Sequence, residues 1–294
     1  MRALSLFALS ACSKMLGAMD DVQLLDAAVD GDTTPPAIAD FSSSRSVPVA
    51  GETLSITLTL DKAAPESGQM ITLDVDPDVI ATPVQLTIPA AESSIRFDAY
   101  PLRPSARFTI RAHAGESTKE LALRIGGLEV AEVLADPAGA DDRLQWVKLH
   151  NRTSLPIDLL NYRLKAGQAS YNFTDMVLVG VIPAGGCFVF GGPVVSALNG
   201  DPTFSYAVDF TPDLPHGGTQ ATGVAVFDRN AAPVNGVVTP VDTMLIGRSN
   251  AAQLLGPDAE IATPYCGTPI AGTSALRTGG STCVQAQLQP NVCN

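Results

Sequence analysis

Histidine is the side chain that most often acts as a general acid or base in enzymes. The sequence contains three histidines, His113, His150 and His216. His113 lies in a segment of alternating hydrophobicity and His150 follows another, so both are predicted to be positional or surface residues. His216 stands in the loop sequence Leu-Pro-His-Gly-Gly and is expected to be the most exposed, but no base or orienting partner adjoins it.

Local catalytic motifs are missing from the sequence. It contains no His-Glu-x-x-His segment, no Gly-x-Ser-x-Gly elbow and no Gly-x-x-x-x-Gly-Lys-Ser/Thr loop. Zinc-dependent hydrolysis, serine nucleophile chemistry and nucleotide binding therefore have no local signature. We expect a protein that is not an enzyme and that needs no cofactor.

One acidic loop has the donors for a cation. Asp136, Asp141 and Asp142 stand close together in the sequence, and their spacing permits a hard cation such as Ca²⁺. A solvated loop explains these residues at least as well, so the metal site is one of two predictions for this segment.

The five cysteines indicate an oxidising compartment. If Cys12 is set aside, Cys187, Cys266, Cys283 and Cys293 form an even set that permits two disulfides, with more than one connectivity. A pair among the three cysteines near the C-terminal end is the favoured prediction. Cys187 lies in an apolar run, where a buried thiol is the alternative.

The N-terminal segment 1–11 has a basic residue followed by a short apolar stretch, which predicts a targeting signal. Leu-Ser-Ala-Cys, ending at Cys12, resembles the lipobox of bacterial lipoproteins. The resemblance implies cleavage before Cys12 and acylation of this residue, and thus export to the cell envelope with an outer-membrane anchor. An ordinary signal peptide is the alternative. Residues 12–33 are then a flexible acidic tether.

Composition predicts a folded, acidic protein. Hydrophobic residues make up 46% and charged residues 16% of the chain, which is a globular composition. The formal net charge is −12, and no stripe of Lys and Arg interleaved with aromatic residues is present. Such a chain repels phosphate backbones, so nucleic acid is not expected as a direct partner.

Residues 34–125 show the period-two alternation of half-buried strands. Segments 54–60, 71–75, 84–88, 95–97, 108–112 and 121–125 carry it, and turn sequences separate them. About seven short strands in about ninety residues predict an immunoglobulin-like sandwich. The alternating pattern of LSITLTLDKAAPESGQMITLDV resembles that of bacterial immunoglobulin-like surface domains.

Residues 126–294 form a second predicted sandwich. The order of LEVAEVLADPAGADDRLQWVKLHN, VIPAGGCFVFGG and SALR resembles the lamin-tail domain between about 128 and 280. The resemblance implies that Trp146 is a core residue and that Asn151 shapes the turn after its strand. Members often carry acidic residues beside the tryptophan strand, where this chain has Gln145 and Lys148, so no ligand role is carried over.

A long segment at about 192–223 reads as an insertion between strands of this second sandwich, and the C-terminal end is rich in cysteine. Long loops on rigid sandwiches commonly carry binding residues. Phe204, Tyr206, Phe210 and His216 are the candidate binding residues of this loop. If the aromatic rings converge on a groove, stacking against sugar faces is favoured.

The predicted fold class is therefore all-β, with two immunoglobulin-like β-sandwich domains in tandem after a flexible N-terminal tether. The predicted function is a non-catalytic, surface-displayed lipoprotein that acts as an adhesion, interaction or structural module. Its partners would be the membrane, through the lipid, and a protein or polysaccharide at the cell surface. The alternatives are an accessory targeting subunit of an extracellular nuclease or hydrolase system, a glycan-binding module, and a hydrolase that uses the 192–223 loop.

Overall fold

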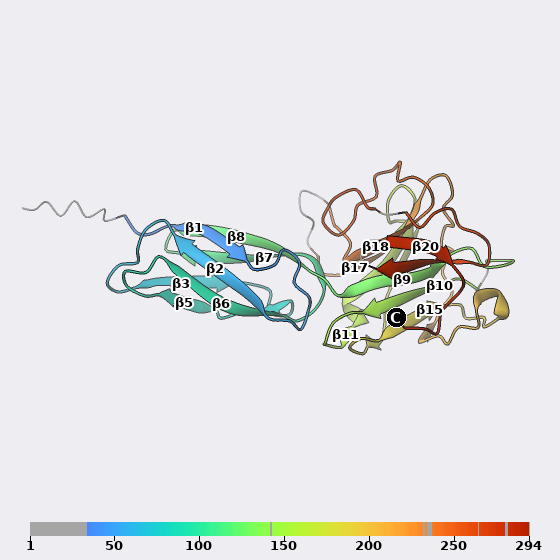
Figure 1. Ribbon diagram of the computed structural model, residues 1–294, viewed down its shortest axis with the longest axis horizontal. Coiled ribbons are helices and arrows are strands. Elements are labelled where there is room, and N and C mark those ends of the chain that lie inside the picture. The colour runs from blue at the N-terminus through green and yellow to red at the C-terminus, as the bar shows by residue number, and fades with distance from the viewer. Residues whose placement is uncertain are drawn as a thin grey trace, which may run out of the picture. The chain divides into compact units, whose positions relative to one another are not determined.

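The computed structural model describes residues 34–293, except for 142, 232, 234–236, 264, 280 and 281 (Figure 1). The predicted signal segment, the acidic tether, Cys12 and Asp142 lie outside the described residues. Within the described ranges, no helix has both the length and the apolar character needed to cross a membrane.

The first half of the described chain consists of eight strands in two four-stranded sheets. One sheet has the order β1-β2-β6-β4 and the other β5-β3-β7-β8, and all pairings are antiparallel. The strands are β1 (Ile38–Ser43), β2 (Leu54–Leu60), β3 (Gln69–Asp74), β4 (Ile80–Ala81), β5 (Gln85–Ile88), β6 (Ser94–Pro101), β7 (Ser105–Ala114) and β8 (Ser117–Ile125).

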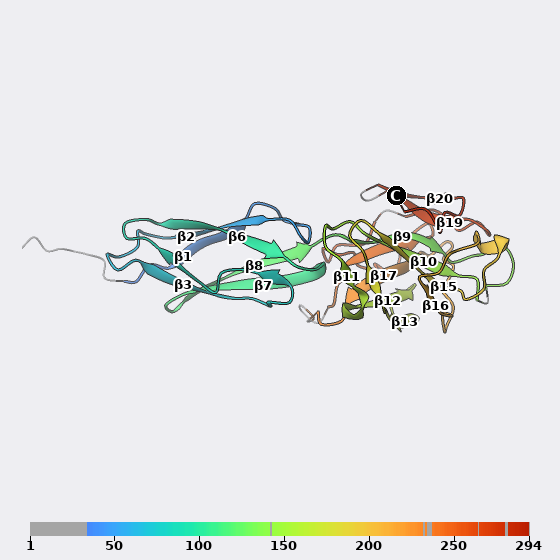
Figure 2. The ribbon, with the colours of Figure 1, turned by 90° about the horizontal axis from the view of Figure 1, so that it is seen from below.

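The predicted alternation is confirmed in the central strand β2, where Leu54, Ile56 and Leu58 are fully buried and the threonines between them are partly exposed. Period-two side chains of one strand point to opposite faces, so one face of each sheet supplies the core. The two sheets lie on either side of this core (Figure 2). Strands β1, β2 and β6 oppose β3, β7 and β8, which is the A-B-E and C-F-G arrangement of an immunoglobulin-like sandwich.

The second half contains twelve strands and two short 3₁₀ helices. The strands are β9 (Leu128–Leu134), β10 (Trp146–Asn151), β11 (Ile157–Asp158), β12 (Tyr162–Gly167), β13 (Thr174–Val177), β14 (Val181–Ile182), β15 (Cys187–Gly191), β16 (Tyr206–Ala207), β17 (Thr222–Asp228), β18 (Asp242–Ile246), β19 (Ser274–Gly279) and β20 (Thr282–Ala286). The helices are η1 (Leu159–Asn161) and η2 (Ala197–Asn199).

These strands form a six-stranded sheet, β16-β15-β10-β9-β19-β20, and a four-stranded sheet, β13-β12-β17-β18, with the small pair β11-β14 beside them. The core lies between the two larger sheets and includes Val147, Leu149, Leu164, Val224 and Val226, all at 0% exposure. Figure 2 shows β9, β10 and β15 on one side of this core and β12 and β13 on the other.

Every residue of β10 and of β17 is buried, so these strands are covered on both faces. One face of each strand packs into the core between the sheets. On the outer side of β10, Trp146 forms a separate apolar cluster with Leu134 and Val189. Phe204 and Leu288 pack on this cluster, so segments from outside the two sheets cover the outer face of β10.

The two halves of residues 36–294 contact one another through the turn between β6 and β7. The hydroxyl of Tyr162 on β12 donates to the carbonyl of Pro104 at 2.8 Å. Arg103 pairs with Asp228 at 2.6 Å, and the two side chains are 12% and 3% exposed. Burial raises the pKa of Tyr162 above its usual range, so its hydroxyl stays protonated and remains a donor.

Candidate functional site

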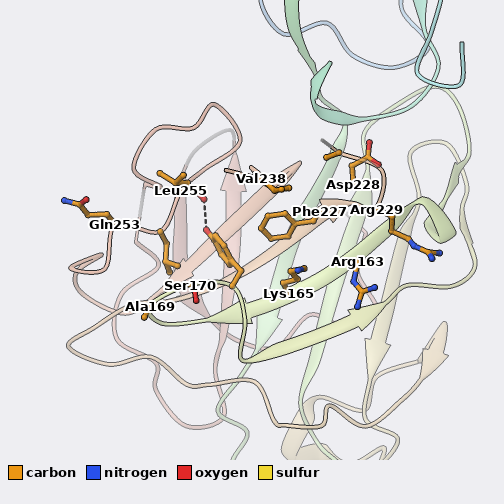
Figure 3. Close-up of a pocket in the computed structure, with 13 residues that line it drawn as sticks. Arg163, Lys165, Ala169, Ser170, Phe227, Asp228, Arg229, Val238, Gln253 and Leu255 are labelled. Carbon is orange, nitrogen blue, oxygen red and sulfur yellow. Dashed lines mark hydrogen bonds between the residues drawn. The ribbon is translucent and has the colours of Figure 1, made fainter. Parts of the chain in front are cut away.

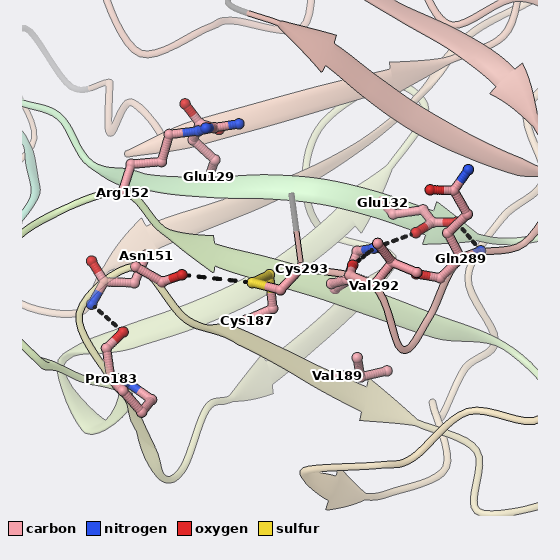
Figure 4. The surroundings of a disulfide bond; sticks show 12 residues. Glu129, Glu132, Asn151, Arg152, Pro183, Cys187, Val189, Gln289, Val292 and Cys293 are labelled. Atoms are coloured by element: carbon pink, nitrogen blue, oxygen red, sulfur yellow. Dashed lines mark hydrogen bonds and ion pairs between the residues drawn. A yellow bond between two sulfur atoms is a disulfide. The ribbon is translucent and has the colours of Figure 1, made fainter.

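Two disulfides close the second sandwich. Cys187 bonds Cys293, and Cys266 bonds Cys283. The prediction of a pair near the C-terminal end is confirmed. The alternative of a free buried thiol at Cys187 is wrong, because the last residues of the chain return to β15 and bring Cys293 beside it (Figure 4).

The C-terminal segment 287–293, hereafter the C-terminal strap, covers part of the outer face of the six-stranded sheet. Lys148 donates to the carbonyls of Gln289 and Val292, at 2.7 Å each. Leu288 packs against the Trp146 cluster. Figure 4 shows Gln289 and Val292 of the strap beside Glu132 of β9. The strap is therefore held by a disulfide, by hydrogen bonds and by apolar contact.

Gln145 and Lys148, on either side of Trp146, have structural roles. Gln145 is buried, and its amide nitrogen donates to the carbonyls of Ala135 and Leu214, at 2.6 and 2.9 Å. Its amide oxygen accepts from the backbone N–H of Leu214 at 2.6 Å. Gln145 thus fixes the loop that precedes His216 to the start of β10. Lys148 forms a buried ion pair with Glu132.

Trp146 is a core residue and Asn151 lies at the turn that leaves β10. Trp146 is fully buried, and its indole N–H donates to the carbonyl of Asn199 at 3.0 Å. Asn151 is also fully buried, and its amide group donates to the carbonyl of Leu155 at 2.7 Å and accepts from the N–H of Thr153 at 2.9 Å. These hydrogen bonds satisfy the backbone of the turn that leaves β10.

The structure brings together three predicted site residues from two loops. Asp136 and Asp141 follow β9, and His216 belongs to the inserted segment. One donor atom from each of the three lies within 4.8 Å of the others. His216 Nε2 is paired with a carboxylate oxygen of Asp141, and His216 Nδ1 lies 3.9 Å from Asp136. The side chains are 25% to 38% exposed. The cluster is thus a partly open carboxylate and imidazole set, not a buried catalytic pair.

The three aromatic residues of the inserted segment do not converge on a groove. Phe210 is 3% exposed and packs edge to face on Phe190, with ring centroids 6.0 Å apart. Phe204 packs on the Trp146 cluster, and Tyr206 is 42% exposed. Phe210 is therefore a core residue. The condition that would favour stacking against sugar faces, convergence of these three rings on one groove, is therefore not met.

The other two histidines do not form a site either. His113 lies in β7, and its Nδ1 is 3.0 Å from the hydroxyl of Thr118. His150 is buried, so of the two predictions for it, a positional or a surface residue, the structure favours the first; burial lowers its pKa, as does the charge of Arg152. Two cysteine sulfurs lie near His150, but both belong to the Cys187–Cys293 disulfide and are not available to a metal.

A cavity of about 440 Å³ lies on the outer side of the four-stranded sheet (Figure 3). Its lining residues come from β12, the following loop, the end of β17 and the segment near 254: Arg163, Lys165, Ala169, Ser170, Tyr171, Phe227, Asp228, Arg229, Ala231, Val238, Gln253, Leu254 and Leu255. Ligand sites for small molecules typically have volumes of about 300–1,000 Å³ and largely apolar walls. This cavity, with its largely apolar lining, is a candidate binding site.

Sequence reasoning did not find this cavity. Two of its cations, Arg163 and Lys165, alternate with the buried Leu164, so the sequence indicates only that they lie on the outer face of a strand. The aromatic partner Phe227 lies on β17, which pairs with β12 in the sheet. Only strand pairing brings these side chains together, and one isolated sequence gives no signal for it.

Comparisons with known proteins add little to this geometry. No family model and no curated protein matches the chain. Among solved structures, it is similar to a C-terminal 282-residue fragment of intimin in complex with the intimin-binding domain of the translocated intimin receptor. That match has 9% identity and a TM-score of 0.26, and it covers 66% of this chain and 60% of that fragment. The chain thus spans less than two thirds of the fragment's own length.

Two further similarities are of the same kind. The D0-D1 domain of intimin matches at 8% identity with a TM-score of 0.26, over 66% of this chain and 93% of that one. Bovine butyrophilin matches at 8% identity with a TM-score of 0.20, over 67% and 90% of the two chains. The class of the protein follows from its own sheets: it is an all-β protein of tandem immunoglobulin-like sandwiches with two disulfides.

Proposed function

We propose that the protein is an exported, non-catalytic interaction module, displayed at the cell surface by lipid on Cys12. The observation that carries the proposal is the pair of disulfides, which use all four cysteines that remain after Cys12. Disulfides persist in oxidising compartments and are rare in the reducing cytosol. Residues 9–12 resemble a lipobox, and the proposed acyl chains on Cys12 form the anchor. Two or more acyl chains hold a protein stably at a membrane.

The second sandwich is proposed to be a lamin-tail-like domain. Its support is the match between what the resemblance implies and the contacts of Trp146 and Asn151 described above. The turn before β15 agrees with it, because the N–H of Gly186 donates to the carbonyl of Pro183 at 2.9 Å. Gly185 has φ +66°, which a glycine adopts without strain. In this proposal the sandwich presents loops to a protein or polysaccharide partner and supplies no catalysis.

In this proposal, the clusters and the cavity of the described residues bind a partner and do not catalyse a reaction. The cluster of Asp136, Asp141 and His216 contains no nucleophilic hydroxyl or thiol. The cavity on the four-stranded sheet contains Ser170, but no histidine lines it. A nucleophile of this type needs an adjacent base to react.

The anchor is tested by expressing the full chain in a Gram-negative host and measuring its intact mass after membrane fractionation. The expected result is loss of residues 1–11, acyl mass on Cys12 and recovery in the membrane fraction. Cys12→Ala is expected to be soluble, whereas Ser13→Ala is the matched control and should stay in the membrane. A soluble wild-type chain that retains Met1 would contradict the anchor.

The interaction role is tested with the same cells. Cells that display the wild-type chain are expected to co-aggregate, or to bind a polysaccharide-coated surface, more than cells that release Cys12→Ala. Tethering raises the effective concentration for weak contacts, so the difference should grow with the density of displayed protein. Equal binding by both cell types at every density would refute the surface-display function.

A further inference from the structure

The cavity on the four-stranded sheet combines fixed apolar walls with an excess of positive charge. Tyr171 and Phe227 form its aromatic side, with ring centroids 5.3 Å apart at an interplanar angle of 67°. The hydroxyl of Tyr171 donates to the carbonyl of Leu255 at 2.7 Å and lies 2.9 Å from the hydroxyl of Thr243. The aromatic wall is therefore positioned before any ligand arrives, which lowers the entropic cost of binding.

Three cations lie along the other side of the cavity. Lys165 places its ammonium 5.5 Å from the centre of the Phe227 ring, within the range of a cation–π contact. Arg163 on β12 and Arg229, directly after β17, also line the cavity (Figure 3). Arg229 donates to the carbonyl of Leu160 at 3.0 Å, and this bond leaves its charge unneutralised.

Carboxylates near the cavity do not balance these charges. Arg163 and Lys165 share one carboxylate, that of Asp175, at 2.8 and 3.5 Å. Asp228 also lines the cavity, but it is paired with Arg103 of the first sandwich. Three cations thus face one carboxylate that is not paired elsewhere. This local excess of positive charge occurs in a chain whose formal net charge is −12.

A ligand that fits this cavity has two parts. Its body is apolar, because aromatic and leucine side chains form the walls. Its head is an anion, because the cations have too few carboxylate partners and charge-assisted hydrogen bonds to Lys and Arg are the strong ones. A neutral sugar satisfies neither requirement, since it offers no anionic group and loses hydrogen bonds to water against apolar walls.

We propose that this cavity binds a small amphipathic organic anion, that is, an aryl or alkyl carboxylate or sulfonate. The proposal deepens the interaction function by naming a ligand class for one surface of the module. Binding is measured in solution without the membrane anchor. The two proposals therefore fail separately: a chain without acyl groups can bind the anion, and an anchored chain can lack this site.

The test uses the full chain carrying Cys12→Ala, which avoids detergent, and a matched pair of fluorescent probes. Anilinonaphthalene sulfonate has the aryl body and the anionic head. N-phenylnaphthylamine has the same body without the sulfonate. We expect saturable binding of one sulfonate probe per chain and at least about fivefold weaker binding of the neutral probe, which corresponds to about 1 kcal/mol.

Two variants separate charge recognition from structural effects. Lys165→Gln is expected to weaken sulfonate binding about five- to tenfold and to change neutral-probe binding less than about twofold. Asp175→Asn removes the competing carboxylate and is expected to tighten sulfonate binding. A merely structural role for Asp175 would not produce this gain. Lys119→Gln, at an exposed position on β8, is the control and should have no effect.

Competition distinguishes the two possible ligand bodies. Displacement of the probe by octanoate but not by naphthoate indicates an alkyl ligand, and the reverse indicates an aryl ligand. If Lys165→Gln does not fold, the salt dependence of binding to the wild type serves as the test instead. Added salt should weaken binding of the sulfonate probe and leave binding of the neutral probe unchanged. Non-saturable binding, equal affinity for both probes, or weaker binding by Asp175→Asn would overturn the proposal.

Discussion

The ammonium of Lys148 lies 2.6 Å from the carboxylate of Glu132, and the two side chains are 3% and 0% exposed. The same carboxylate accepts from the hydroxyl of Ser274 at 2.5 Å and from the backbone N–H of Gln289 at 2.9 Å. This pair therefore joins β9, β10 and β19 to the C-terminal strap. A buried carboxylate such as that of Glu132 destabilises the folded protein when its ion-pair and hydrogen-bond partners are removed.

Lys148→Met leaves Glu132 buried without its cation. We expect a loss of about 3–5 kcal/mol in the free energy of unfolding, because the unpaired carboxylate loses its water without compensation. Chemical denaturation of the full chain measures this loss. The double variant Lys148→Met with Glu132→Leu should recover much of the stability, whereas equal stability of the wild type and Lys148→Met would show that the pair contributes nothing.

The two disulfides are expected to contribute unequally. Cys187–Cys293 closes 106 residues and Cys266–Cys283 closes 17. In the chain-entropy account, loops of these sizes give about 4–5 and about 3 kcal/mol. Replacing Cys187 and Cys293 by serine should therefore lower the denaturation midpoint more than replacing Cys266 and Cys283. The reverse order would show that strain or residual structure in the unfolded chain outweighs loop closure.

Asp242 should make stability depend on pH. Burial raises its pKa to about 6, although Arg277 at 2.8 Å and the N–H of Val130 at 2.7 Å favour the charged form. The folded protein then binds this proton more tightly than the unfolded chain, whose Asp has a pKa of about 3.9. The contribution of Asp242 to stability is full below pH about 4 and is lost as the pH rises through about 6.

The measurement is the free energy of unfolding between pH 4 and 7 for the wild type and Asp242→Asn. We expect the wild type to lose on the order of 2–3 kcal/mol more than the variant over this range. Carboxyl-carbon NMR provides the control, because it reports the titration of Asp242 directly. A folded-state pKa below 4 would mean that Arg277 dominates over burial.

The metal site predicted from the sequence used Asp136, Asp141 and Asp142. In the structure, His216 lies beside Asp136 and Asp141, so we test this set of three residues instead. An imidazole with two carboxylates suits Zn²⁺ or Mn²⁺ better than Ca²⁺, which takes oxygen ligands. We expect Zn²⁺ to bind the full chain in calorimetry and His216→Ala to weaken this binding about tenfold or more. His113→Ala is the matched control. Equal Zn²⁺ affinity of the wild type and His216→Ala would remove the prediction.

Much of the fold is visible in the sequence because strand periodicity is a local property. The alternation of residues 54–60 predicts which side chains of β2 face the core, and the structure confirms it. Fully buried strands such as β17 carry no alternation, and their position depends on what covers them. The sequence predicts a second sandwich there, but not which strand lies next to which.

The cluster of Asp136, Asp141 and His216 was only partly predictable. The sequence singled out His216, Asp136 and Asp141, but gave no reason to place the histidine beside the carboxylates, because 75 or more residues separate them and buried Gln145 fixes the connecting loop. It assigned Phe210 to a binding surface, and packing against Phe190 placed it in the core.

By itself, the sequence determined the all-β class, the capacity for two disulfides and the lack of local catalytic motifs, since composition and short spacing fix these. Tertiary structure decided the cysteine partners, the buried Lys148–Glu132 pair and the cavity beside Phe227. Each of these joins residues from different strands or from the chain end. Contacts of that kind depend on strand pairing and on the burial of whole faces, and neither is encoded in any short stretch of the chain.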